Sequence, residues 1–420
     1  MEIKVLREYQ IELADKTYSI LKEYYIAYLS MEMRVGKTLI ALKAAELLGV
    51  KNVLFVTKKK AIYSIQNDYE NEHFGFDLTI INYEQLDKYE PEFDLVIVDE
   101  SHNLGAYPKP SQRTVRLKKI IGANYLIMLS GTPSPESYSQ LFHQFWISDF
   151  TPFKHSNFYK WAKEYVLVKE KWINGYKIND YSRAYNDKIM QVLNPYFISY
   201  TREEAGFKQI NIIEEIKIVD INPKINVLVK LLLDNKFYEF RDGSKIVCDS
   251  AVKLQNKIHQ IYSGSVICED GSAKVLDLSK IEFIIQHYKG LKIAIFYKFI
   301  AEGKIIKNNI SNYTEDPEEF NKSNDKIFVS QILSGSMGVN LETADVLLFY
   351  NIDFSSTLYW QSRARIMNFN RNKPPIINWI FSNGGIEKKI YDVVLKKRSF
   401  TTYYFKKHYL NGEYKYVAKN

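Results

Sequence analysis

The tripeptide Gly36-Lys37-Thr38 is typical of phosphate-binding loops, and it ends the stretch MEMRVGKT at residues 31–38. The complete loop pattern begins with a further glycine five residues before the first residue of this tripeptide. Met31 stands at that position. A bare Gly-Lys-Thr arises by chance in roughly one chain in ten of this length and composition. The surrounding sequence therefore has to decide whether this is a nucleotide site.

The surroundings favour a nucleotide site. An apolar segment at 27–31 precedes the loop, and a segment with helical spacing at 38–49 follows it. A helix that begins after a strand directs free N–H groups at an anion. Lys37 would then reach the β- and γ-phosphates, and the Thr38 hydroxyl would hold Mg²⁺. The alternative is an ordinary helix start with a solvated lysine.

A second candidate is the acidic pair Asp99-Glu100, which ends the apolar run LVIV in the stretch LVIVDESH. Open α/β sheets bind ligands at the carboxyl ends of their strands. Asp99 could bind Mg²⁺ directly or through water, and Glu100 could orient and deprotonate an attacking water. Adjacent acids repel each other unless a cation is near, so the pair itself indicates a metal. The alternative is a common acidic turn.

A third strand end is the stretch MLSGTP at 128–133. Ser130 and Thr132 are expected at the same sheet edge, where they could relay hydrogen bonds between the phosphate site and a neighbouring lobe. By itself this stretch indicates only a turn. It becomes a specific signal because it is the third motif at a strand end, after Gly36-Lys37-Thr38 and Asp99-Glu100.

Length and composition indicate a globular protein with more than one core. The chain has 420 residues, of which 46% are hydrophobic and 25% charged, and this favours two domains. Two cysteines and seven scattered histidines give no disulfide framework and no zinc spacing. The uncharged stretch at 120–135 is too polar for a membrane span, and no signal peptide is visible, so we expect a cytoplasmic protein.

The formal net charge of +8 permits a polyanionic partner without proving one, since most charge runs are solvated faces. The 32 tyrosines and 24 phenylalanines could stack on bases. AT-rich coding is a simpler cause of their abundance, because lysine, asparagine and isoleucine are enriched with them.

Apolar runs that alternate with helical segments predict parallel sheets covered by helices. The predicted strands lie at 27–31, 53–57, 78–83, 95–99, 125–129, 292–299, 326–331, 345–351 and 376–381. The predicted fold is therefore α/β, with lobe one at 1–136, a helical insertion at 137–208, and lobe two with a C-terminal helical tail at 209–420.

These motifs resemble those of superfamily-two helicases and translocases, particularly the Swi/Snf-like branch in its compact bacteriophage-type form. The resemblance covers nearly the whole chain in order. It rests on LREYQ (6–10), MEMRVGKT (31–38), VLFVTKKKAIYSIQNDYE (53–70), IINYEQL (80–86), DESH (99–102), LSGTP (129–133), NPYFISYTREEAGF (194–207), KIAIFYKF (292–299), LSGSMGVNLETADVLLFYN (333–351) and YWQSRARI (359–366).

The resemblance implies two RecA-like lobes that bind ATP and Mg²⁺ between them, and it assigns roles by position. The implied ATP-binding residues are Gln10 at the adenine, Arg34, Val35, Gly36, Lys37, Thr38, Gly338, Gln361 and Arg365. The implied coupling residues are His102, Ser130, Gly131 and Thr132. The implied DNA-binding residues are Thr57, Lys58, Asn82, Lys298, Ser334 and Asn340.

The chain departs from the family pattern in three places. Arg34 stands where a second glycine is frequent, and the segment between 299 and 333 is short. Asn368 replaces the usual second arginine of the last motif. Arg365 is therefore the expected arginine finger, and Arg371, about one helical turn beyond Asn368, is the alternative if the helix continues that far.

The leading hypothesis is an ATP-driven DNA motor, a helicase or translocase in phage DNA replication, recombination or repair, acting in the bacterial cytoplasm if phage-encoded. Duplex or branched DNA is favoured over RNA on analogy. An ATP-gated DNA clamp with little turnover is the alternative, favoured by Asn368 alone. A small-molecule kinase would leave the second lobe unexplained.

Overall fold

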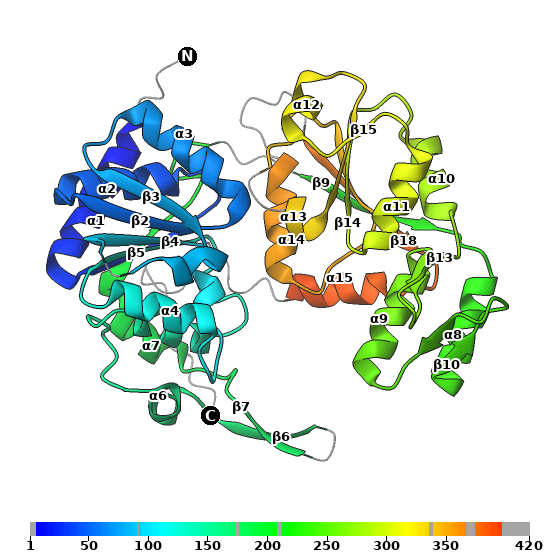
Figure 1. Cartoon of the computed structure of the whole chain (residues 1–420), viewed down its shortest axis with the longest axis horizontal. Helices are drawn as coiled ribbons and strands as arrows, with labels where there is room; N and C mark the ends of the chain where they lie inside the picture. Colours follow the sequence, from blue (N-terminus) through cyan, green and yellow to red (C-terminus); the bar gives the residue numbers. More distant parts are fainter. Residues whose placement is uncertain are drawn as a thin grey trace. The chain divides into compact units, whose positions relative to one another are not determined.

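The structure is a computed structural model that describes residues 6–90, 92–173, 176–207, 212–335, 339–366 and 374–396. The described residues fall into two compact units, the first ending at 207 and the second running from 212 to 396 (Figure 1). Each unit is an α/β lobe built on a six-stranded sheet. No helix of these described ranges combines the length and the apolar character that crossing a membrane requires.

The sheet of the first unit has the strand order β3-β2-β4-β5-β1-β8 and is parallel throughout. Its strands are β1 (Ile26–Met31), β2 (Asn52–Thr57), β3 (Asp77–Asn82), β4 (Leu95–Asp99), β5 (Tyr125–Ser130) and β8 (Phe197–Tyr200). The five strands predicted for this lobe are all present. They were recognisable because a parallel strand buried on both faces reads as a continuous apolar run.

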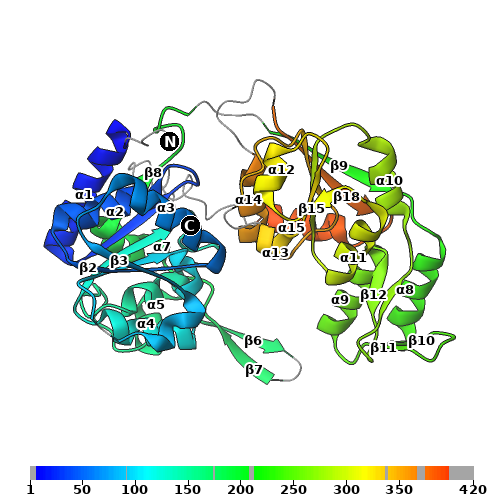
Figure 2. The ribbon, with the colours of Figure 1, turned by 45° about the horizontal axis from the view of Figure 1, so that its top comes forward.

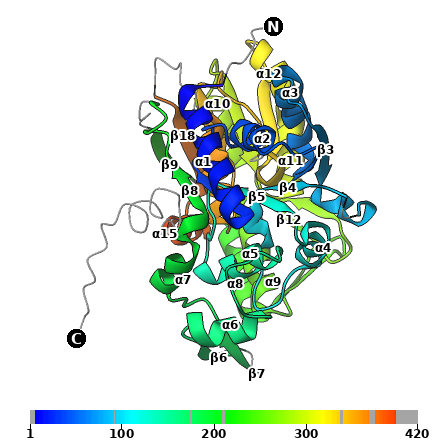
Figure 3. The ribbon, with the colours of Figure 1, turned by 90° about the vertical axis from the view of Figure 1, so that its left-hand side faces the viewer.

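Helices cover both faces of this sheet, as Figures 1 and 3 show. One face carries α1 (Glu8–Tyr24), α2 (Lys37–Leu48) and α3 (Ile62–Glu72), and the other carries α4 (Gln112–Ile121), α5 (Leu141–Trp146), α6 (Phe158–Tyr165) and α7 (Asn186–Leu193). Successive strand residues alternate between the two cores: Ala27 and Leu29 lie in the first, and Ile26 and Tyr28 in the second.

The described part of residues 137–207 contains the α-helices α5, α6 and α7, the 3₁₀ segments Tyr138–Gln140 and Asn194–Tyr196, a β-hairpin and a sheet strand. The hairpin consists of β6 (Lys169–Ile173) and β7 (Tyr176–Asp180), and it extends away from the sheet in Figure 2. Strand β8 pairs with β1 beside the loop that begins at residue 32. Much of the aromatic content predicted here is core, since Phe158 and Trp161 are buried.

The sheet of the second unit is also parallel, with the order β15-β16-β14-β17-β18-β9. Its strands are β9 (Ile213–Val219), β14 (Ile293–Tyr297), β15 (Tyr313–Thr314), β16 (Ile327–Gln331), β17 (Val346–Phe349) and β18 (Ile376–Ser382). One face packs against α10 (Ser279–His287) and α11 (Ile300–Asn309), and the other against α12 (Pro317–Lys322), α13 (Ile332–Gly335), α14 (Ser356–Arg363) and α15 (Glu387–Lys396).

A small subdomain follows β9 and has its own apolar core. It contains α8 (Lys224–Asn235), β10 (Phe237–Glu239), β11 (Lys245–Val247), α9 (Ala251–Tyr262), β12 (Ser265–Ile267) and β13 (Ala273–Val275). A buried hydrogen bond of 2.6 Å joins His259 Nε2 of α9 to Asn351 Oδ1, directly after β17. The subdomain is thereby fixed to the sheet.

Candidate functional site

The loop at 32–36 connects β1 to the N-terminus of α2 and has an unusual backbone. Arg34 and Gly36 both adopt left-handed conformations, with φ of 67° and 85°. Left-handed residues in such loops form the backbone concavities that bind anions. A Cβ on residue 36 would lie 2.0 Å from Nε2 of Gln10, the movable end of that side chain, so it is the left-handed φ that favours glycine there.

Met31 occupies the leading position of the loop pattern, and its backbone is still strand. It pairs with Tyr200 of β8, and its side chain is buried in the core. The chain leaves the sheet only after Glu32, whose N–H donates to the Tyr200 carbonyl at 3.1 Å. A strand residue needs no glycine, and this explains physically why the first glycine is dispensable.

Three side chains contact this loop. The Tyr9 hydroxyl donates to the Val35 carbonyl at 3.1 Å, and Gln10 Nε2 lies 3.5 Å from the same oxygen. The Lys37 ammonium donates to the carbonyls of Met31 and Glu32 at 2.9 and 3.0 Å, which holds its charge over the loop. Gln10, assigned to the adenine by resemblance, is therefore packed directly on the phosphate loop.

Asp99 and Glu100 lie at the carboxyl end of β4. The Asp99 carboxylate accepts hydrogen bonds from the Thr57 hydroxyl at 2.8 Å and from the Glu100 N–H at 2.9 Å. Burial and the adjacent Glu100 raise the pKa of Asp99 to about 6, although Thr57 and Lys37 act in the opposite direction. A divalent cation would restore the ionised form, and the Asp99 carboxylate with the Thr38 hydroxyl offers the hard oxygen ligands that Mg²⁺ prefers.

His102 joins the acidic pair to the next strand end. Its Nδ1 lies 3.0 Å from the Ser130 hydroxyl and 3.3 Å from Glu100 Oε2. Ser130 Oγ in turn accepts from the Thr132 N–H at 3.1 Å. Burial, and then Lys58, lower the pKa of His102 to about 3, so the ring is neutral at physiological pH. Three of the four expected coupling residues thus form one hydrogen-bonded group.

Gly131, the fourth, lies against the strand that precedes the phosphate loop. A Cβ at this position would lie 3.4 Å from the Met31 carbonyl, at the near limit of ordinary van der Waals contact.

A buried hydrogen-bond chain, which the sequence did not predict, extends this group. The Ser101 hydroxyl donates to the Tyr28 hydroxyl at 2.8 Å, which donates to Gln144 Oε1 at 2.7 Å. Gln144 Nε2 donates to the Pro133 carbonyl at 2.8 Å. The chain links β1, the acidic turn and the Ser-Gly-Thr turn. A tyrosine inside a strand that is apolar apart from Tyr28 and Ser30 was the available signal.

The DNA-binding residues expected in the first unit lie at the carboxyl ends of β2 and β3. Thr57 is buried, and its hydroxyl is used on Asp99. The Asn82 side chain accepts from the Glu84 N–H at 3.0 Å and so begins the short 3₁₀ segment Tyr83–Lys88. Lys58 is half-buried at the start of Lys59–Ala61. Of the three, Lys58 has the side chain best suited to a phosphate contact.

Of the DNA-binding residues expected in the second unit, Lys298 and Ser334 follow strands β14 and β16 at the carboxyl edge of its sheet, whereas Asn340 precedes β17. Lys298 follows β14, and its ammonium pairs with Asp353 at 2.7 Å. The Ser334 hydroxyl donates to the Gln331 carbonyl at 3.1 Å. Asn340 is exposed, and its carbonyl accepts from Asn321 Nδ2 at 2.9 Å.

The last motif spans α14 and the 3₁₀ segment Ala364–Ile366. Gln361 is buried, whereas Arg365 is half-buried, and its carbonyl accepts from the Leu341 N–H at 3.2 Å. Arg363, two residues earlier, forms an ion pair with Glu214 at 2.8 Å. Gly338, Asn368 and Arg371 lie outside the described residues.

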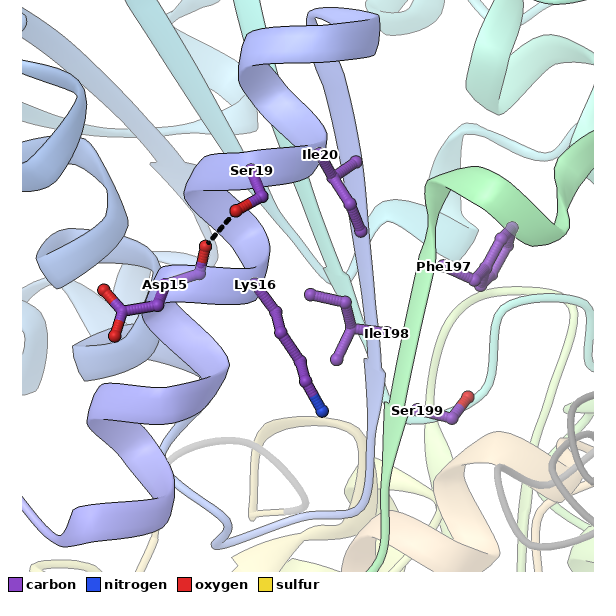
Figure 4. A pocket seen from close by; sticks show the side chains of 7 residues that line it. All are labelled: Asp15, Lys16, Ser19, Ile20, Phe197, Ile198 and Ser199. Atoms are coloured by element: carbon purple, nitrogen blue, oxygen red, sulfur yellow. Dashed lines mark hydrogen bonds between the residues drawn. The ribbon is translucent and has the colours of Figure 1, made fainter.

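A hollow of about 500 Å³ lies on the flank of the first unit, between α1 and β8 (Figure 4). It is lined by Asp15, Lys16, Ser19, Ile20, Phe197, Ile198 and Ser199. None of these was expected to bind a ligand, and none belongs to the phosphate loop.

No protein-family model matches the chain. Relatives with significant similarity include the transcriptional regulator ATRX of Mus musculus (27% identity, covering 34% of this chain and 6% of the relative), the DNA excision repair protein ERCC-6 of Homo sapiens (26%, 39% and 10%) and the helicase SWR1 of Candida glabrata (25%, 42% and 13%). The aligned stretches thus span only a small fraction of these relatives.

Among solved structures, the Sulfolobus solfataricus SWI2/SNF2 ATPase core in complex with dsDNA is similar, with 18% identity, a TM-score of 0.43, and coverage of 94% of this chain and 92% of that one. The three sequence similarities cover 34–42% of this chain, and they fall on proteins named as a transcriptional regulator, a DNA excision repair protein and a helicase.

Proposed function

We propose that this protein is an ATP-dependent DNA motor that hydrolyses ATP to move along or remodel DNA. The observation that carries the proposal is the gathering of three groups at one sheet edge: the phosphate loop, the Asp99-Glu100 pair and the Ser130 turn. Each group alone has an ordinary structural explanation. A loop shaped for phosphate beside a half-buried acid suited to a cation is what nucleotide hydrolysis needs.

In this proposal Lys37 binds the β- and γ-phosphates, and Gln10 contacts the adenine from its place on the loop. Thr38 and Asp99 hold Mg²⁺, which when bound neutralises charge on the phosphates. Glu100 orients and deprotonates the attacking water. The group of His102 and Ser130 reports the state of this site to the rest of the chain.

The second lobe would complete the cycle. Arg365 is proposed to contact the γ-phosphate, with Arg371 as the alternative finger and Gly338 and Gln361 as further nucleotide contacts. An arginine engaged only while ATP is present makes closure of the lobes depend on the nucleotide. Such arginines contribute about 10³ to 10⁵ in turnover in related chemistry.

DNA is the proposed track. The net charge of +8 suits phosphate contacts, which are largely independent of sequence. Relatives named as a helicase and as a DNA excision repair protein support the choice. We place the activity in phage DNA replication, recombination or repair within a bacterial host, on the strength of the compact phage-type resemblance.

The competing function is an ATP-gated clamp that binds DNA with little turnover. Asn368 favours it, because an arginine that would drive hydrolysis is replaced by a neutral side chain. Phosphate release measured with and without DNA separates the two, since a clamp would bind ATP and DNA yet release phosphate no faster on DNA.

The decisive experiment is steady-state ATP hydrolysis in parallel with duplex DNA, single-stranded DNA, forked DNA and RNA. We expect stimulation by DNA that Lys37→Ala abolishes. Arg365→Ala should lower turnover at least about a hundredfold, and Arg371→Ala more than about tenfold with ATP affinity little changed. A wild-type protein that hydrolyses no ATP with any nucleic acid would refute the motor.

A further inference from the structure

The hairpin of β6 and β7 extends from the first unit as a two-stranded ribbon (Figures 1 and 2). Its antiparallel register runs from the pair Lys169–Asp180 to the pair Ile173–Tyr176. A two-stranded ribbon is marginally stable alone and buries little apolar surface. This ribbon therefore depends on its base for order, and its outer part is accessible.

The base of the ribbon is fixed to the lobe. Strand-like pairing continues below the hairpin, where the Leu167 N–H donates to the Arg183 carbonyl at 2.8 Å. The hydroxyls of Ser137 and Ser139 donate to the carbonyls of Ser182 and Tyr181 at 2.7 and 2.6 Å. Both serines lie just after the Ser-Gly-Thr turn, so the ribbon is attached to the segment that leaves the candidate ATP site.

Trp172 is the notable side chain of the ribbon. It is 73% exposed, whereas Trp161 and Trp379 are fully buried. In the register it stands opposite Lys177, and cross-strand partners share one face of a ribbon. Lys177 itself pairs with Glu170, on the same face, at 2.6 Å. The ring of Trp172 is therefore accessible to a partner, with the Lys177 side chain on the same face.

The local charge identifies the kind of partner. Residues 154–188 contain eight lysines and arginines against four acids, a net charge of +4, which is half the net charge of the chain. A basic segment that also presents an exposed aromatic ring offers the two components of single-strand binding: cations for the phosphates and a stacking platform for a base.

We propose that the ribbon reads DNA structure, with Trp172 stacking on an unpaired base and Lys177 contacting the adjacent phosphate. The inference rests on the proposed motor function and deepens it by naming the substrate class. Bases within a duplex are already stacked on both faces, so an intruding ring finds a partner only at a fork, flap or gap. The ribbon therefore directs the motor to branched DNA.

The test uses forked DNA that carries 2-aminopurine at its first unpaired position, with a blunt duplex of the same sequence as reference. Stacking on Trp172 should quench the probe when the wild-type protein binds. Trp172→Ala should remove the quenching and weaken fork binding at least about fivefold, with duplex binding unchanged. Trp172→Phe should restore part of both signals, because phenylalanine retains a ring.

Ile178→Ala is the matched control, since this side chain is also exposed but lies on the opposite face of the ribbon. It should behave as wild type. Normal quenching and fork affinity in Trp172→Ala would overturn the ribbon proposal and leave the motor intact. Equal loss on fork and duplex would also overturn it, since the ring would then serve general binding. Failure of the motor is recognised separately, as no DNA-stimulated hydrolysis in the wild type.

Discussion

Asp99 in the first lobe is a half-buried carboxylate and Glu387 in the second a fully buried one, and their surroundings shift the pKa in opposite directions. Burial and the neighbouring Glu100 raise the pKa of Asp99 to about 6. Burial would also raise the pKa of Glu387, but the Lys280 ammonium at 2.9 Å overcomes this and lowers it. Asp99 is held instead by the Thr57 hydroxyl and a backbone N–H.

The difference separates a structural charge from one suited to a ligand. Glu387 has the Lys280 ammonium as its counter-ion, and the pair is almost fully excluded from solvent. The negative charge of Glu387 is therefore balanced within the protein, without a ligand. The donors on Asp99 orient the carboxylate without neutralising its charge. A cation supplied with the nucleotide would complete that site.

Glu100→Gln should give the largest effect if the first lobe is catalytic. The amide keeps the size of the side chain but cannot accept a proton from water, so turnover should fall by about a thousandfold or more with ATP still bound. ATP hydrolysis and nucleotide binding, measured together, check this. Glu90→Gln, an exposed acid of the same lobe, is the control. Near-normal hydrolysis in Glu100→Gln would exclude the catalytic role.

Glu387→Ala should show that the second lobe's carboxylate is structural. Removing it leaves the Lys280 ammonium buried without its ion-pair partner, at a cost of about 3–5 kcal/mol in the free energy of unfolding. Chemical denaturation measures the loss. The double variant Lys280→Met with Glu387→Leu should recover most of it, because no charge remains buried. A single variant as stable as wild type would contradict the comparison.

Thr57→Val tests the orientation of Asp99 with a smaller expected effect. The change removes one hydrogen bond at nearly constant volume, so ATP turnover should fall by about tenfold and more Mg²⁺ should be needed for half-maximal rate. Thr57→Ser retains the hydroxyl and should behave almost as wild type. If DNA affinity fell with turnover unchanged, Thr57 would face the track, as the family resemblance implied.

The smallest effect concerns His259, which lies between the subdomain and the second sheet. Burial, and then Lys298, lower its pKa to about 4, although Glu387 and Asn351 favour its protonated form and Lys280 opposes it. The unfolded state binds this proton from about pH 6.5 downward, and the folded state binds it only near pH 4. The free energy of unfolding therefore decreases as the pH is lowered through that window.

Between pH 7.5 and 5.5 this proton should remove about 1 kcal/mol from the free energy of unfolding. Denaturation at both pH values would measure the loss, and His259→Gln should show a flatter dependence than wild type. An unchanged pH dependence in the variant would place the titration elsewhere, for example at His102 or His143, which are also buried with lowered pKa values.

Much of the fold followed from the sequence because parallel strands buried on both faces leave an unmistakable apolar run. Strand β8 was missed because it is four residues long within a segment whose aromatic spacing favours helix. The subdomain after β9 was missed because its four strands have only three residues each. At that length local composition no longer distinguishes a strand from a turn.

The candidate site was predictable to the level of strand ends, and less so to the level of side-chain partners. The side chain of a residue at a strand end can face solvent or the neighbouring strand. The Thr57 side chain faces the neighbouring strand, where its hydroxyl donates to Asp99. The bond from Tyr28 to Gln144 joins residues 116 positions apart, which tertiary packing alone brings together. Local sequence patterns contain no information about which distant residues will form such a hydrogen bond.

The strand conformation of Met31 has a consequence for how related chains are found. A sequence-pattern search that requires glycine at the position of Met31 would miss this protein. A search by backbone shape would retain it, because the left-handed residues at 34 and 36 are present whatever letter closes the strand. Chains catalogued as lacking a nucleotide loop can therefore be re-examined by geometry, with the strand end as the point of alignment.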